Sequence, residues 1–188
     1  LKKAPGSAPS QPSTRRLHIK VDNAWDEIFL PRNVKRFEQN ALAGYLVSRR
    51  WFAGQGRRIT GVTIADTITC APAVDSLILL VKVTYTAGDP ETYMIPVMFM
   101  PARDRSEEIR SLEGNIICDL TVGDREGVVY DSAVDKQFHR FLLKLIAGGR
   151  KAGEKDLRIT GEPEKCVRTI LGGRDIDSIT AQALEGGH

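Results

Sequence analysis

The clearest candidate for chemistry is a short segment that combines glycines with arginines. Residues 53–58 read Ala-Gly-Gln-Gly-Arg-Arg, and exposed backbone amides beside two guanidinium groups could hold a phosphate. A dinucleotide-binding G-x-G-x-x-G pattern would need glycine where the chain has Ile59, and it would open a helix. An alternating apolar strand follows instead. We therefore favour a structural loop over a phosphate site.

Two other basic features have simpler structural explanations. The first is a glycine-rich stretch, residues 148–155, which contains Arg150, Lys151 and Lys155 but lacks G-x-x-x-x-G-K-[ST]. Its first two glycines, Gly148 and Gly149, are explained by the end of a helix. The second is Lys82, which is placed like the nucleotide-contacting lysine of kinases. Period-two alternation puts Lys82 on the solvent face of a strand, so neither feature is assigned to a nucleotide.

Side chains that commonly bind metals or act as nucleophiles are few and widely separated: His18, His139, His188, Cys70, Cys118 and Cys166. There is no C-x-x-C pair, and no histidine has a metal-ligand spacing to another, so a zinc site and a disulfide framework are disfavoured. Carboxylates are plentiful, but Asp131 and Asp135 are explained as helix caps. We assign no catalytic, cofactor-binding or metal-binding residue to this chain.

Composition limits the classes of partner. The 188 residues carry a net charge of +3, which is too small for a nucleic-acid footprint. The longest apolar run, Leu77 to Val81, is far shorter than the roughly 20 residues that span a bilayer. The three cysteines are read as reduced thiols. We expect a cytoplasmic protein that binds neither nucleic acid nor membrane.

The elements that must position the glycine–arginine segment begin after a Pro-rich arm. Residues 1–16 show no hydrophobic periodicity and are expected to be a flexible linker. Residues 17–21 alternate as a strand does. After Pro31, Asn33 can cap one long amphipathic helix, whose apolar residues recur at helical spacing: Val34, Phe37, Ala41, Leu42, Tyr45 and Leu46.

Strand patterns dominate the middle of the chain. They lie at residues 62–70, 77–85, 92–100, 116–121 and 128–130, and Pro96 predicts an edge or a bulge. A second helix is expected near 132–147, with Ser132 and Asp135 as a capping box. Weaker strand patterns follow at 157–160 and 166–171. The fold class is therefore α+β, an antiparallel sheet packed with one long N-terminal helix and the second helix.

The segment from Arg49 to Arg57, Arg-Arg-Trp-Phe-Ala-Gly-Gln-Gly-Arg, resembles the R-x-R-W-F-x-G-K-x-R signature of the maltokinase N-terminal cap. Residues 93–97 resemble the family's Y-x-L-P-L strand, and residues 127–132 resemble its G-x-x-x-D-A segment. The resemblance implies a cap-like domain over residues 17–171 and a tail, 172–188, that leads toward a kinase lobe. Gln55 departs from the family's usual lysine, which weakens the idea of phosphate contact.

The resemblance also implies what a parent protein would do. Maltokinases transfer the γ-phosphate of ATP to maltose, with magnesium, and many are fused behind a trehalose synthase. The chain lacks the S-N-T-S-type nucleotide loop and the H-G-D-like motif that supply this chemistry. We therefore expect a non-catalytic cap whose partners are the catalytic lobes of the parent kinase and a fused trehalose synthase domain. The alternative is an independent, non-catalytic module that binds a protein or a carbohydrate.

The signature segment supplies the candidate docking residues. They are Arg49, Arg50, Trp51, Phe52, Gly54, Gly56, Arg57 and Arg58. Trp51 and Phe52 directly follow the amphipathic helix, so both rings are expected to be buried anchors between helix and sheet. The four arginines are expected to face solvent or a kinase lobe.

Overall fold

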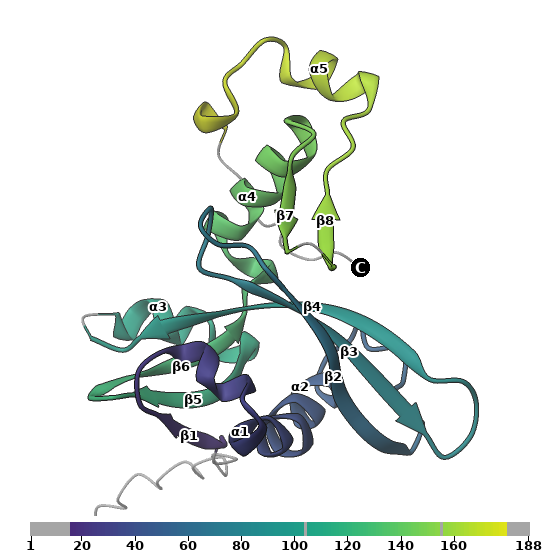
Figure 1. The fold of residues 1–188 in the computed structure, drawn as a ribbon, viewed down its shortest axis with the longest axis vertical. Coiled ribbons are helices and arrows are strands. Elements are labelled where there is room, and N and C mark those ends of the chain that lie inside the picture. Colours follow the sequence, from purple (N-terminus) through teal and green to yellow (C-terminus); the bar gives the residue numbers. More distant parts are fainter. Residues whose placement is uncertain (1–15, 104, 155, 180–188) are drawn as a thin grey trace, which may run out of the picture.

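The computed structural model describes residues 16–103, 105–154 and 156–179 and has an α+β fold (Figure 1). Six strands form one curled sheet: β1 His18–Val21, β2 Ile59–Thr69, β3 Leu77–Tyr85, β4 Glu91–Pro101, β5 Ile116–Val122 and β6 Arg125–Asp131. Their order across the sheet is β1-β5-β6-β4-β3-β2. The predicted central strands are confirmed in place.

The sheet is mixed, and the expectation of an antiparallel sheet was wrong at one edge. Strand β1 pairs in parallel with β5, with His18 opposite Asp119 and Val21 opposite Val122. The other four pairings are antiparallel. Alternation identified β1 as a strand, but a strand pattern carries no information about the direction of its partner. That direction depends on a contact between distant parts of the chain.

Strand β4 changes partners along its length. Its residues 91–97 pair with β3, and its residues 97–101 pair with β6. Pro96, which has no N–H to donate, lies just before the second partner begins. The strand is internal in the sheet order, yet Pro96 lies in the half that pairs with β3 alone. This explains how an internal strand accommodates a proline.

The single long α-helix expected after Pro31 does not form as a regular α-helix. It is divided into α1 (Pro31–Arg36), a π-helical segment η2 (Phe37–Leu42) and α2 (Ala43–Val47). The residues it buries repeat in adjacent pairs every four positions: Phe37 and Glu38, Ala41 and Leu42, Tyr45 and Leu46. At 3.6 residues per turn, a four-residue repeat would rotate off the sheet. The wider i to i+5 turns keep these pairs facing it.

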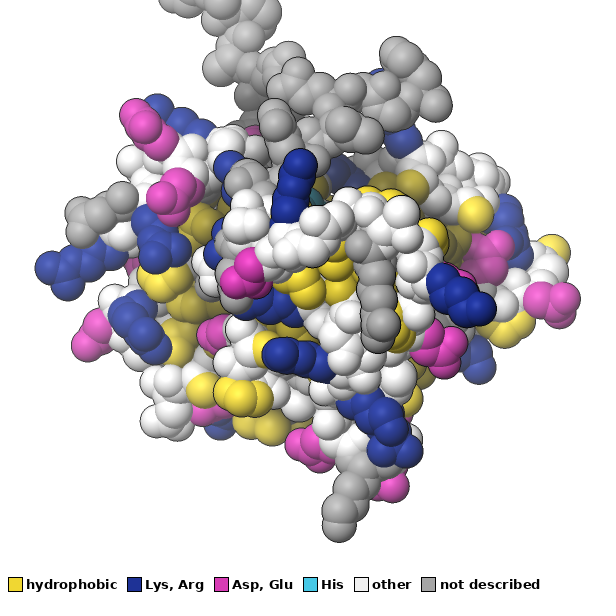
Figure 2. Space-filling model, turned by 90° about the horizontal axis from the view of Figure 1, so that it is seen from above, with side chains coloured by type: hydrophobic (Ala, Val, Ile, Leu, Met, Phe, Trp, Pro, Cys, Tyr) yellow, Lys and Arg dark blue, Asp and Glu magenta, His cyan; other side chains and the backbone are white. Residues whose placement is uncertain are grey.

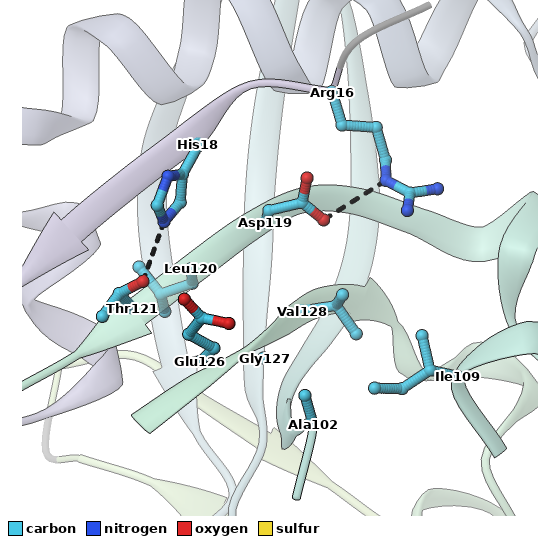
Figure 3. A pocket seen from close by; sticks show the side chains of 10 residues that line it. All are labelled: Arg16, His18, Ala102, Ile109, Asp119, Leu120, Thr121, Glu126, Gly127 and Val128. Carbon is cyan, nitrogen blue, oxygen red and sulfur yellow. Dashed lines mark hydrogen bonds and ion pairs between the residues drawn. The ribbon is translucent and has the colours of Figure 1, made fainter. Parts of the chain in front are cut away.

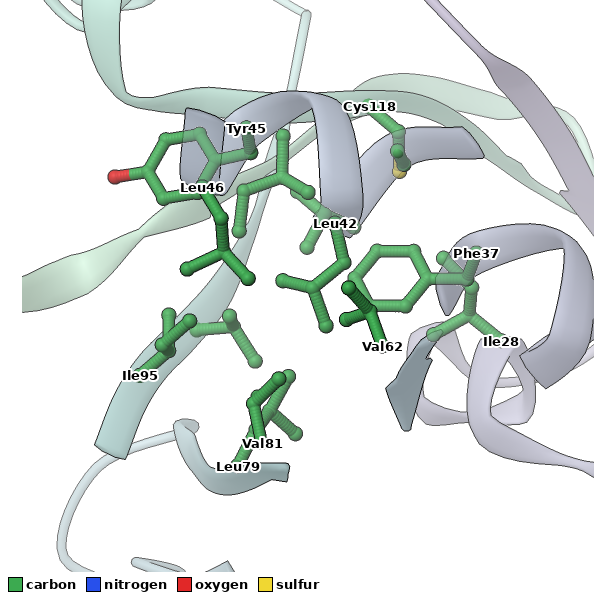
Figure 4. Packing of buried hydrophobic residues seen from close by; sticks show 14 of the residues in the cluster. Ile28, Phe37, Leu42, Tyr45, Leu46, Val62, Leu79, Val81, Ile95 and Cys118 are labelled. Atoms are coloured by element: carbon green, nitrogen blue, oxygen red, sulfur yellow. The ribbon is translucent and has the colours of Figure 1, made fainter. Parts of the chain in front are cut away.

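Two hydrophobic clusters hold the elements together. The larger joins η2 and α2 to strands β1 through β6, and its central side chains are shown in Figure 4. They include Ile28 from the 3-10 helix η1 (Trp25–Phe29), Phe37, Leu42, Leu46, Val81, Ile95 and Cys118. The smaller cluster joins α4 (Lys136–Ala147) to residues of β2 through β6. Helices η2 and α2 therefore pack on the sheet in the larger cluster, and α4 packs on it in the smaller one.

Helix α4 begins later than the expected residue 132. A 3-10 turn, η4 (Ser132–Val134), precedes it, and two aspartates cap the two segments. Asp131 accepts from the Ala133 N–H at 2.9 Å, and Asp135 accepts from the Gln137 N–H at 2.7 Å. The predicted capping by Asp131 and Asp135 is confirmed, but Ser132 is not the cap. Two separate caps produce two short segments where the sequence pattern showed one.

The remaining described elements are short. They are α3 (Ser106–Ser111), η3 (Glu113–Asn115), β7 (Lys151–Gly153), β8 (Arg158–Thr160), α5 (Lys165–Leu171) and η5 (Ile176–Ser178). β7 and β8 form a hairpin, so the strand expected at 157–160 is confirmed. The strand expected at 166–171 was wrong, because these residues form α5. Six residues in which apolar and polar types do not strictly alternate fit either element, and here the helix forms.

Most of the expected N-terminal arm and part of the expected tail, residues 1–15 and 180–188, lie outside the described residues. Arg16, placed in the arm by sequence, forms ion pairs with Glu113 at 2.7 Å and with Asp119 at 3.3 Å. Within the described residues, no helix combines the length and the apolar character that a bilayer crossing requires.

Candidate docking surface around the signature loop

The signature loop, residues 48–58, connects α2 to β2 through successive tight turns. Backbone N–H groups of Phe52, Gln55 and Arg57 donate to the carbonyls of Arg49, Phe52 and Gly54. The Gln55 side chain also donates to the Arg49 carbonyl at 2.7 Å. Amides that would have to converge on a phosphate are therefore engaged within the loop. This geometry supports the structural-loop interpretation.

The two aromatic residues of the loop have different environments. Phe52 is 2% exposed and belongs to the large core cluster, as expected for an anchor. Trp51 is 51% exposed, so its expected burial was wrong. Tyr93 contacts both rings, with centroids 5.2 Å from Phe52 and 6.0 Å from Trp51. Adjacent residues in a turn point in different directions, and only one of the two rings can reach the core.

Gly54 allows the loop to lie close to the sheet. A Cβ atom at this position would be 2.3 Å from the Tyr85 hydroxyl and 2.5 Å from the Phe52 ring. Both neighbours are held, since Phe52 is buried and the Tyr85 hydroxyl donates to Glu91 at 2.6 Å. Glycine at this signature position therefore has a steric cause.

Arg57 binds the loop to the β3–β4 hairpin. Its guanidinium carbon lies 3.5 Å from the centroid of the Tyr85 ring. The same group donates to Glu91 at 2.5 Å and to the Asp89 carbonyl at 3.1 Å. A planar guanidinium can stack on an aromatic ring while its edge donates to a carboxylate. Arg57 therefore holds the loop against the hairpin, whereas the sequence predicted that it faces solvent or a partner.

Glu91 is the shared acceptor of this cluster. It receives hydrogen bonds from the hydroxyls of Tyr85 and Tyr93 as well as from Arg57. Because these donors favour the ionised carboxylate, the pKa of Glu91 lies below its usual 4.5. Burial and the hydrogen bond to this carboxylate raise the pKa of Tyr85 above its ordinary value. The tyrosines therefore remain protonated donors at neutral pH.

Arg49 is also engaged inside the molecule. Its guanidinium lies 4.7 Å from the centroid of the Tyr45 ring and donates to the Gly114 carbonyl. Tyr45 in turn donates to Asp131 at 2.7 Å, which connects α2 to the end of β6. In the part of the chain that the structure describes, Arg50 and Arg58 are exposed and their side chains have no hydrogen-bond or ion-pair partner.

The structure thus divides the predicted site residues into two groups. Arg49, Phe52, Gly54 and Arg57 fix the loop against the sheet. Arg50, Trp51 and Arg58 remain on the surface, where a partner could reach them. Gly56 adopts a positive φ of 77° in the turn between the groups, with open space around its Cα. Sequence reasoning missed Tyr85, Glu91 and Tyr93, because only the register of the β3–β4 hairpin brings them to the loop.

A separate cavity of about 410 Å³ lies over β1, β5 and β6 (Figure 3). His18 contacts the Thr121 hydroxyl there at 2.8 Å, and Arg16 donates to Asp119 at 3.3 Å. A hydroxyl nucleophile with a histidine base also needs a group that orients the histidine. The carboxylate of Asp119 is bonded to Arg16 instead, so the cavity offers no such relay.

The sequence of the loop and of the strands around it matches a known family. Residues 45–135 match the model of the maltokinase N-terminal cap domain. The matched range begins at Tyr45 in α2 and ends at Asp135, the cap of α4, so it includes the signature loop and β2 through β6. The resemblance drawn from the sequence is therefore confirmed: residues 45–135 of this chain are similar to the maltokinase N-terminal cap domain.

Proposed function

We propose that this chain is the non-catalytic cap of a cytoplasmic maltokinase and that it packs on the nucleotide lobe through the surface formed by Arg50, Trp51 and Arg58. The parent activity would be the ATP- and magnesium-dependent phosphorylation of maltose to maltose 1-phosphate, in trehalose and α-glucan metabolism. The observation that carries the proposal is the exposed Trp51 within the matched family segment.

A half-exposed tryptophan is costly to leave in water and is a frequent centre of binding energy in interfaces. Trp51 rests on Tyr93, which is itself held by Glu91, so the ring is presented on a fixed support. Arg50 and Arg58 are exposed and close to Trp51 in sequence. Arginine, like tryptophan, is enriched in protein interfaces. An exposed aromatic ring that is held in place, with unpaired guanidinium groups close in sequence, suits a docking role.

The proposal is tested by mixing the chain with the catalytic lobes of a maltokinase produced without their own cap and measuring affinity by calorimetry. Trp51→Ala should weaken binding by at least about 2 kcal/mol, as expected of a central interface residue. Met94→Ala is the matched control, because Met94 is 56% exposed on another element. Equal effects of the two substitutions would contradict docking through Trp51.

The non-catalytic part of the proposal has its own test. The purified chain should show no ATP-dependent phosphorylation of maltose in a coupled assay for ADP, since it lacks the nucleotide-loop and H-G-D-like motifs. Sustained turnover that controls show is not due to a contaminating kinase would contradict the non-catalytic assignment. It would not affect the proposed docking surface.

The exposed Trp51 also favours the second candidate, an independent module that binds a carbohydrate by stacking on the indole. Titration with maltose, followed by tryptophan fluorescence, distinguishes the two functions. A saturable change that is lost in Trp51→Ala, together with no affinity for the kinase lobes, would favour the carbohydrate module. Trp25, 9% exposed, provides the unaffected background signal.

A further inference from the structure

A second cleft, of about 690 Å³, lies between the loop at residues 70–73, helix α4 and strand β7. Its volume is within the roughly 300 to 1,000 Å³ typical of small-molecule sites. Cys70, Phe141 and Leu145 supply buried apolar surface among its lining residues. None of the cleft's residues belongs to the signature loop, so the cleft is separate from the docking surface proposed above.

The polar lining of this cleft is basic. Arg140, Lys144, Arg150 and Lys151 all line it, and no aspartate or glutamate does. The whole chain has a net charge of only +3, so this is a local concentration of positive charge. Figure 2 views the molecule from the end at which α4, α5 and β7 lie, and shows arginine and lysine side chains, with acidic side chains among them, around patches of hydrophobic surface.

The spacing of the cations on α4 does not stabilise the helix, although the place of Lys144 in the last turn suits a cation. Lys136, Arg140 and Lys144 follow one another at four-residue spacing, which places like charges next to each other on the helix. Such pairs destabilise a helix by a few tenths of a kcal/mol. Some arginines elsewhere in the described chain are paired with carboxylates, as Arg32 is with Glu27 and Arg57 with Glu91. Arg140, Arg150 and Lys151 have no such partner among the described residues.

The turn at the end of α4 brings Arg150 and Lys151 to the same cleft as Arg140. The Gly149 N–H donates to Ile146 and the Arg150 N–H donates to Leu145, with Gly149 at a φ of 58°, which is a Schellman ending. The Gly148 N–H donates to the Lys144 carbonyl. The last carbonyls of the helix are therefore occupied by the chain's own amides and present little free negative charge to an approaching anion.

We propose that this cleft binds a small phosphate-bearing molecule, with its phosphate between Arg140, Arg150 and Lys151 and its remainder against the floor formed by Phe141 and Leu145. Guanidinium groups bind phosphate through paired N–H donors, and the lysine adds a point charge. Gln137, also in the lining, offers an amide to a hydroxyl of the ligand. Burial raises the pKa of the Cys70 thiol to about 11, so it remains neutral and adds apolar surface to the floor.

The test is calorimetry of the full chain with two probes, inorganic pyrophosphate and a hexose phosphate, in low salt. The double variant Arg140→Ala, Lys151→Ala should bind both at least about tenfold more weakly. The matched control, Lys35→Ala with Arg36→Ala, removes the same charge from exposed positions on α1 and should bind as the wild type does. Urea unfolding confirms that both variants fold.

Tighter binding of the hexose phosphate than of pyrophosphate assigns the floor to the sugar, and the reverse order assigns the site to phosphate groups alone. Either order supports the cleft when the control retains binding. Equal losses in the two double variants would mean unspecific attraction of anions, and this would overturn the proposal. If neither probe binds, the proposal is overturned. Binding of a poly-glutamate peptide in that case would show that the cleft is a protein interface.

Discussion

The guanidinium of Arg57 lies flat enough against Tyr85 to bring its carbon to 3.5 Å from the ring centroid. This contact joins a loop that follows the first helices to β3, the neighbour of the edge strand β2. It also leaves the edge of the guanidinium free to bond Glu91. The signature loop is therefore coupled to the β3–β4 hairpin, and its arginines differ in what they stabilise.

Substitution of Arg57 should destabilise the fold. Arg57→Ala removes the ring contact and the partly exposed ion pair, so we expect a loss of about 1 to 2 kcal/mol in urea unfolding. Arg57→Lys should recover only part of it, because an ammonium lacks the planar fork. Arg58→Ala should stay within about 0.5 kcal/mol of the wild type. Equal effects at positions 57 and 58 would refute the division of roles.

Glu91 should make stability depend on acid. Its folded pKa is lower than its usual 4.5, so its contribution is present above that value and is lost as pH falls through the folded pKa. Stability of the wild type should therefore decline more steeply than that of Glu91→Gln below about pH 4.5. Urea midpoints measured over this range provide the comparison. Parallel curves for the two proteins would rule out Glu91 as the titrating group.

The two aromatic residues of the loop should differ strongly on truncation. Phe52→Ala removes a buried ring and should cost about 3 to 5 kcal/mol. Trp51→Ala should cost less than about 1 kcal/mol, since half of its surface is already in water. Chemical unfolding of the two variants, with unchanged m-values, gives the answer. A tryptophan variant as unstable as the phenylalanine variant would show that Trp51 is an anchor after all.

Glycine replacements should have opposite signs at two positions. Gly54→Ala should destabilise by about 1 to 3 kcal/mol, because its Cβ would collide with Phe52 and Tyr85. Gly44→Ala should stabilise by up to about 1 kcal/mol, because Gly44 lies in α2 with nothing within 4 Å of an added Cβ. Thermal unfolding of both variants is sufficient. A neutral Gly54→Ala would mean that the loop can move away from the sheet.

Glu38 connects the π-helical segment η2 to strand β2 through one hydrogen bond. This carboxylate is 7% exposed and accepts from the Ile64 N–H at 2.7 Å, where the β2–β3 register shifts. Glu38→Ala should leave that N–H without an acceptor and cost about 1 to 3 kcal/mol. Glu38→Gln keeps a carbonyl oxygen at the same position and should recover much of the loss. If the two variants are equally unstable, the hydrogen bond to Ile64 is not the cause.

Local patterns predicted the elements whose causes are local. Alternation located β1 through β6, and the glycines at 148 and 149 located the end of α4, because pleat period and Schellman geometry act over a few residues. The π-helical turns were not apparent, although the four-residue repeat of buried residues was their signal. The strand expected at 166–171 was wrong, because six residues without strict alternation do not separate strand from helix.

The candidate site was predicted in sequence but not in its arrangement. The signature identified Arg49 through Arg58 as a unit, and the family match confirmed the resemblance. Which of its side chains point inward depends on Tyr85, Glu91 and Tyr93, and these reach the loop only through strand register. A sequence pattern cannot separate Trp51 from Phe52, since the two residues are neighbours of the same chemical kind.

The parallel pairing of β1 with β5 also fixes an order of events during synthesis. Residues 18–21 leave the ribosome well before residues 116–122, which form their partner strand. Until then, the apolar side chains of Ile19 and Val21 have no strand beside them, and the edge of β1 is open to other chains. Closing such a long loop is slow compared with forming the β3–β4 hairpin. Strand β1 is therefore made before its partner but pairs late, and its apolar side chains stay exposed on the nascent chain until it does.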